Sequence, residues 1–176
     1  MSLATSAAAD LILLGETNLT QDLPLANIRF YQTEPCRKGG VLSGVSSKVS
    51  KHEFIRSFMQ NAIWSIAIVK GVRVHMLNVY VPDASKPKEE KDRLFKWVNH
   101  MIGQKTFKAN QCEYVIVSGD FNQELEAYQK LLRSYNLNPI LTPKTATHVC
   151  GGMLDQTFTN LNVQSHTLVY EFISDQ

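Results

Sequence analysis

Residues 114–122 read Tyr-Val-Ile-Val-Ser-Gly-Asp-Phe-Asn, and most of what the sequence predicts about the fold starts from this stretch. The run 114–118 is apolar throughout, as expected of a β-strand that is buried on both faces of a sheet. Gly119 ends the run, and Asp120 and Asn122 follow it at once. Loops that leave a rigid sheet are a common place for catalytic groups. The stretch therefore predicts a central strand with a carboxylate and an amide at its end.

Other stretches show the same arrangement of an apolar run beside a polar residue. The polar residues at these further predicted strand ends are Glu16, Asn78, Tyr80 and Asp155. A carboxylate in such a place provides the hard oxygen ligand that Mg²⁺ prefers, and a second carboxylate can deprotonate a metal-bound water. Each residue alone is weak evidence, because short motifs match by chance.

The remaining chain alternates apolar runs, turn signals and two helical patterns. Lys70-Gly71 separates two β-rich runs and predicts a tight hairpin. An apolar stripe from Leu94 to Met101 recurs at helical spacing and ends at Gly103, and a second helix is predicted over residues 124–134. The predicted strands cover residues 10–15, 27–33, 41–45, 62–69, 72–81, 114–118, 153–159 and 167–173.

This order of elements predicts an α/β layered domain. Without a repeat or a linker, the whole chain, residues 1–176, is predicted to be one domain. We expect the runs 10–15, 72–81 and 114–118 to be central strands, because each is almost continuously apolar.

Composition narrows the class of protein without deciding the function. The chain has 176 residues, 18 Lys plus Arg and 16 Asp plus Glu, and this even balance argues neither for nor against nucleic-acid binding. Its three cysteines lie far apart, so a disulfide framework or a cysteine zinc site is not expected. No apolar run approaches the roughly 20 residues that span a bilayer. We therefore expect an intracellular protein without a membrane partner.

Taken together and in this order, the motifs resemble those of the endonuclease/exonuclease/phosphatase family, and most of all the endonuclease domains of non-LTR retrotransposons and related mobile elements. The matching segments are LLGETNL at 13–19, NVYVP at 78–82, VSGDFN at 117–122, THVCGGMLD at 147–155, LDQTFTN at 154–160 and a final Ser174-Asp175. The resemblance implies a layered sandwich of two mixed sheets with outer helices. It also implies Mg²⁺-dependent or Mn²⁺-dependent hydrolysis of phosphodiester bonds in nucleic acid, with DNA the first choice, and a nuclear location if the chain is a mobile-element endonuclease.

The same resemblance implies a role for each matching residue. Asp120 would orient or deprotonate the attacking water, and Asn122 would hold a phosphate oxygen. Tyr80 would contact the phosphate or the leaving group, and Asp155 would orient a histidine. The implied metal ligands are Glu16 and Asp175, and the implied substrate-binding residues are Asn78, Arg37, Thr147 and His148.

The sequence also departs from the family pattern. The family's Ser-Asp-His reads Ser174-Asp175-Gln176 here, and glutamine carries no positive charge and relays no proton. An upstream strand with a metal-site asparagine is also missing, since only nine residues precede Asp10. We therefore expect a sandwich that lacks its first strand and cleaves slowly. Two alternatives stay open, namely a phosphatase or lipid phosphodiesterase of the same family, and a non-catalytic nucleic-acid-binding relic.

Overall fold

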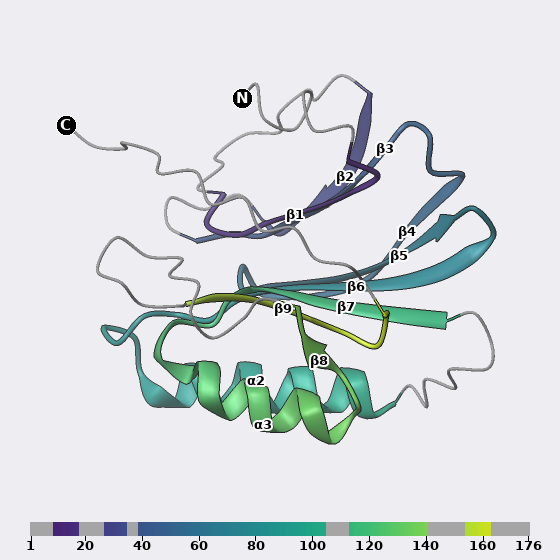
Figure 1. The fold of residues 1–176 in the computed structure, drawn as a ribbon. Helices are drawn as coiled ribbons and strands as arrows, with labels where there is room; N and C mark the ends of the chain where they lie inside the picture. Colours follow the sequence, from purple (N-terminus) through teal and green to yellow (C-terminus); the bar gives the residue numbers. More distant parts are fainter. Residues whose placement is uncertain (1–8, 18–26, 35–38, 105–112, 141–153, 163–176) are drawn as a thin grey trace.

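The computed structural model describes residues 9–17, 27–34, 39–104, 113–140 and 154–162, and these form two packed β-sheets with helices on one side (Figure 1). The smaller sheet has the order β1-β3-β2, from β1 (Leu11–Leu14), β2 (Ile28–Gln32) and β3 (Leu42–Ser46). Both of its strand pairs are antiparallel.

The larger sheet has the order β4-β5-β6-β7-β9-β8 and is mixed, because β6 and β7 run parallel. Its strands are β4 (Lys51–Phe58), β5 (Ala62–Val69), β6 (Val72–Tyr80), β7 (Glu113–Asp120), β8 (Asn138–Pro139) and β9 (Asp155–Thr159). The predicted hairpin is confirmed, with Lys70 and Gly71 both at positive φ, as the tight turn requires.

The two helices cover the face of the larger sheet that points away from the smaller one (Figure 1). They are α2 (Lys88–Gly103) and α3 (Leu125–Ser134), and a short 3₁₀ turn, η2 (Asn122–Glu124), leads into α3. Helix α2 begins six residues before the apolar stripe, because Pro87 precedes it and Glu89 and Glu90 lie in its first turn, where the helix dipole favours acidic residues. No described helix is long and apolar enough to cross a membrane.

Two apolar clusters hold the layers together. The main core lies between the larger sheet and the helices and includes the fully buried Trp64, Phe121 and Tyr128. A smaller cluster lies between the two sheets and is built on Val45, Ala67, Val74 and Met76, among other residues. The expected α/β sandwich with outer helices is thus confirmed, with the helices on the larger sheet.

One expectation about strand order is wrong. Strands β6 and β7 are central, as predicted, but β1 lies at an edge of the smaller sheet in the described part of the chain, where β3 is the middle strand. Strand β1 is apolar because Leu11 and Leu13 pack against the cluster between the sheets. Leu14, at the end of the strand, is exposed. The predicted strand over residues 167–173 lies outside the described residues.

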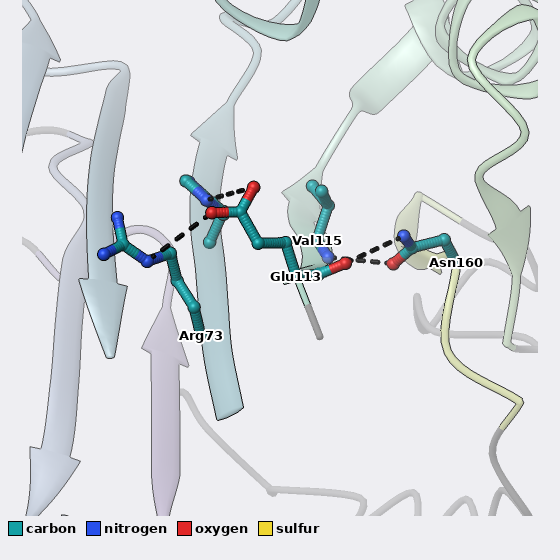
Figure 2. Close-up of polar contacts among 5 residues, drawn as sticks. Arg73, Glu113, Val115 and Asn160 are labelled. Carbon is teal, nitrogen blue, oxygen red and sulfur yellow. Dashed lines mark hydrogen bonds and ion pairs between the residues drawn. The ribbon is translucent and has the colours of Figure 1, made fainter. Parts of the chain in front are cut away.

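Polar contacts tie β6, β7 and β9 together at the end of the sheet where β7 begins (Figure 2). Arg73 Nε lies 3.5 Å from Glu113 Oε1, which links the parallel strands β6 and β7. Asn160, directly after β9, accepts a hydrogen bond from Val115 N at 2.9 Å. These contacts lie at the end of the sheet opposite to the predicted site residues Tyr80, Asp120 and Asp155.

Candidate functional site

Three of the predicted site residues lie in a row at one end of the larger sheet. Tyr80 at the end of β6 is paired in register with Asp120 at the end of β7, and Asp120 is paired with Asp155 at the start of β9. Neighbouring strands lie about 4.8 Å apart, so the row brings a phenol and two carboxylates together. The predicted convergence of these three residues is a direct result of strand register.

Glu16 reaches the same place from the smaller sheet. It follows β1 in a left-handed conformation (φ 46°), which is uncommon for a residue with a side chain. The next residue, Thr17, donates its backbone N–H to Gly40 O at 3.1 Å. The Glu16 carboxylate lies near the Tyr80 hydroxyl, where its charge acts on the phenol. The candidate site therefore draws residues from both sheets.

Tyr80 is surrounded by negative charge. Burial, the hydrogen bond to Glu16, and the charges of Glu16, Asp120 and Asp83 all raise the pKa of the Tyr80 phenol above its usual range. The phenol is therefore neutral at physiological pH and acts as a hydrogen-bond donor. A donor at this position suits a phosphate oxygen or a departing oxygen, both of which become more negative during cleavage.

The Gly39-Gly40 loop lies directly against Tyr80. A Cβ atom at Gly39 would lie 3.1 Å from Tyr80 Cε1, and Gly39 has a φ of 88°. Both observations favour glycine, since a side chain would crowd the phenol and strain the backbone. The contact places this loop at the border of the site, whereas Arg37, predicted to bind substrate, lies outside the described residues.

The turn after β7 is fixed by its own polar groups. Asn122 N donates to Asp120 Oδ1 at 2.8 Å, and Asn122 Nδ2 donates to Val81 O at 2.6 Å. Asn122 has a positive φ of 46°. Non-glycine residues in such strained conformations cluster at functional sites, so this geometry supports a role for the turn beyond linking β7 to α3.

Asn78 joins the two sheets beneath the site. It is buried, and its Nδ2 donates to Leu14 O at 2.7 Å and to Leu42 O at 2.9 Å. These bonds link carbonyl groups of β1 and β3 to a residue of β6. The amide predicted to bind substrate therefore has a structural contact that helps to position Glu16, two residues after Leu14.

The donor chemistry at Glu16 and Asp120 fits a hard divalent cation. Within the described ranges, no group of three or more His, Cys, Asp or Glu side chains is close enough to form a metal site. Mg²⁺ commonly takes one or two carboxylates and fills its other positions with water and substrate phosphate. Glu16 provides one such carboxylate, and Asp175, the other predicted ligand, lies outside the described residues, as do Thr147 and His148.

A small hollow of about 180 Å³ opens beside Tyr80. Its lining includes Asn61, Lys86 and Glu90, and it borders a larger hollow with which it shares these residues. Sequence patterns did not single out Asn61, because an amide before an apolar strand reads as an ordinary turn residue. Its burial and its contacts with Tyr80 are visible only in the folded chain.

Solved structures share this architecture, whereas no protein-family profile and no curated protein sequence matches the chain. The endonuclease domain of TRAS1, a telomere-specific non-LTR retrotransposon, superposes with a TM-score of 0.61 at 13% identity, over 89% of this chain and 75% of that one. The AP endonuclease LMAP from Leishmania major gives 0.70 at 12% identity, over 90% and 72%. A humanized D. rerio TDP2 gives 0.60 at 13% identity, over 94% and 74%.

These similarities establish the fold. The chain has the two-sheet architecture of endonuclease/exonuclease/phosphatase proteins, and the first two of these neighbours are endonucleases by name. At such low identity the residues of this chain must carry any argument about its activity.

Proposed function

We propose that the chain hydrolyses phosphodiester bonds in nucleic acid, DNA in the first instance, with the help of Mg²⁺ or Mn²⁺. The observation that carries the proposal is the convergence of Tyr80 and Asp120, paired in register on neighbouring strands, with the charge of Glu16 beside the phenol. The row from Tyr80 through Asp120 to Asp155 extends this pair across three strands. Residues 1–176 act as one domain in this proposal.

The proposed chemistry divides among the residues. Bound at Glu16 and Asp175, the metal ion would supply Lewis-acid stabilisation of the phosphate. Asp120 accepts a proton from the attacking water. A hydrogen bond from Asn122 N orients its carboxylate for this role. Tyr80 donates a hydrogen bond to the oxygen that gains charge, and Asn122 holds a phosphate oxygen. Arg37, Thr147 and His148 would bind the substrate, Asn78 would support Glu16 from beneath the site, and Asp155 would orient the group at position 176.

Gln176 limits the rate in this proposal, because it replaces a charged or proton-relaying group by a neutral amide. The loss of one such group commonly lowers a rate by about 10²–10⁴-fold. A Gln176→His variant with a few residues appended is therefore expected to nick DNA faster than the unmodified chain. Equal rates for the two chains would exclude Gln176 as the limiting residue.

Nicking of supercoiled plasmid tests the proposed function directly. We expect nicking with Mg²⁺, none with chelator, and a loss of about 10³-fold in Asp120→Asn, which keeps an oxygen that can accept from Asn122 N. Asp92→Asn on the exposed face of α2 removes the same charge away from the site and should change the rate less than twofold. DNA binding without nicking, in the unmodified chain and in Gln176→His, would favour the non-catalytic alternative and refute the proposal.

A further inference from the structure

Asn61 binds the backbone of Tyr80 on both sides of its Cα atom. Asn61 lies in the turn between β4 and β5 and is 1% exposed. Tyr80 N donates to Asn61 O at 2.7 Å, and Asn61 Nδ2 donates to Tyr80 O at 3.1 Å. One buried residue therefore satisfies the N–H and the C=O of the residue that carries the phenol.

The bond from Tyr80 N to Asn61 O extends the sheet ladder by one residue, and the bond from Asn61 Nδ2 takes the place of the Asn61 backbone N–H, which donates to Phe58 O instead. The paired register of β5 and β6 reaches Ala62 and Val79, so Tyr80 is the first residue of β6 beyond it on that side. The Asn61 amide supplies an N–H where the next backbone donor of a longer β5 would lie. On the other side, Val81 N donates to Asp120 O at 2.8 Å. The last residue of β6 is thus held between Asn61 and β7.

The hydrogen bonds to the Tyr80 backbone determine where the phenol hydroxyl lies. The phenol meets Glu16, which comes from the other sheet, so a small shift at the end of β6 would move the hydroxyl away from the carboxylate. The amide of asparagine reaches the Tyr80 carbonyl and donates to it. Alanine lacks the donor, and an aspartate carboxylate would place an acceptor against that carbonyl.

We propose that Asn61 is a positioning residue for Tyr80, whose backbone it holds so that the phenol faces the Glu16 carboxylate at the cleavage site. The positioning itself is a property of the folded chain. Its effect on catalysis rests on the proposed function, so a spectroscopic experiment tests the first and a kinetic experiment tests the second.

The spectroscopic experiment follows the Tyr80 ring by NMR in the full chain labelled with ¹³Cζ-tyrosine. The chain has six tyrosines, and Tyr80→Phe assigns the resonance. Glu16→Gln marks where the resonance moves when the carboxylate is neutralised. Asn61→Ala should move it in the same direction. The isosteric Asn61→Asp is the second variant if Asn61→Ala does not fold.

Thr159→Val is the matched control. Thr159 is buried in β9 of the same sheet, and its Oγ1 donates to Val115 O at 2.6 Å and accepts from Leu161 N at 3.1 Å, so this variant removes a buried bond from a side chain to a backbone carbonyl and one further bond. It should leave the Tyr80 resonance in place. A Tyr80 resonance that moves in neither Asn61 variant would overturn the proposal, whether or not the chain cleaves DNA.

The kinetic experiment is a double-mutant cycle on nicking rates. Asn61→Ala should lower kcat about tenfold with little change in KM, because it disturbs a group that acts on the reacting phosphate. In the Tyr80→Phe background the same change should have no further effect. An equal loss in both backgrounds would show that Asn61 does not act through the phenol. Absence of nicking in every variant would refute the proposed function, while the spectroscopic result would still decide the positioning.

Discussion

The candidate site is divided between two unequal halves of the molecule. Tyr80, Asp120 and Asp155 lie on adjacent strands of the larger sheet, which packs on two helices through the main core. Glu16 follows a four-residue strand at an edge of the smaller sheet, and that sheet is held by a smaller apolar cluster. One half of the site thus depends on strand register, whereas the other depends on how the two sheets pack.

A few polar contacts set that packing. Asn78 binds carbonyls of β1 and β3, and Ser43 Oγ lies 2.6 Å from Ser65 Oγ between β3 and β5. Tyr31 of β2 contacts His52 of β4, with ring centroids 4.6 Å apart and the Tyr31 hydroxyl donating to His52 O. We infer that the smaller half can loosen before the larger half unfolds, because local stability follows buried contacts.

The largest expected loss of stability comes from Gly119→Ala, which changes the larger half. A Cβ atom at Gly119 would lie 1.7 Å from Val79 O, so β7 could not keep its pairing with β6. We expect the free energy of unfolding to fall by on the order of 4 kcal/mol, as measured by urea denaturation. Gly15→Ala is the control, because a Cβ atom there meets no heavy atom within 4 Å. Similar losses of unfolding free energy in both variants would show that the close approach of Gly119 to β6 does not hold the larger half together.

An intermediate effect is expected from Asn78→Ala, which should separate the two halves. It removes the two hydrogen bonds that Asn78 Nδ2 donates to Leu14 O and Leu42 O, each of which contributes about 1 kcal/mol. Hydrogen exchange should rise more over β1 and β3 than over β7. Ser43→Ala removes one inter-sheet contact and should give a smaller rise. Equal exchange in both sheets would mean that the molecule opens as one unit.

The smallest expected effect is a loss of stability at low pH, caused by protonation of His52. Burial and then the nearby Arg29 charge lower the pKa of His52 to about 4, from about 6.5 in an unfolded chain. A lowered pKa in the folded state gives stability that is present above pH 6.5 and is lost as the pH falls toward 4. Because His52 is only partly buried, we expect a loss on the order of 1 kcal/mol.

Thermal unfolding of the wild type and of His52→Phe between pH 7 and pH 4 checks this dependence. The variant should lose less stability over that interval, since it has no imidazole to protonate. Identical dependence of stability on pH in the two proteins would show that protonation of His52 does not destabilise the contact between β2 and β4.

The sequence predicted the larger half better than the smaller one. The runs that became β5, β6 and β7 are apolar because both faces are buried, and Gly71 and Gly119 mark the β5–β6 turn and the polar end of β7, so the positions of these strands were predictable. Strand β4 was not predicted, because it is mostly exposed and its alternation is broken by a bulge between Phe54 and Arg56. The meeting of Glu16 with Tyr80 depends on sheet packing, which no local pattern encodes.

The bulge in β4 affects whether copies of the protein associate with one another. In the described part of the chain β4 is an edge strand, and Phe54 and Ile55 expose more than two fifths of their surface there. A flat edge of this kind would offer its backbone groups to the edge of a second molecule and start a fibre. The bulge twists the strand, and Lys51, Glu53 and Arg56 place charges along it. Removing the residue that forms the bulge would favour self-association while leaving the site residues in place.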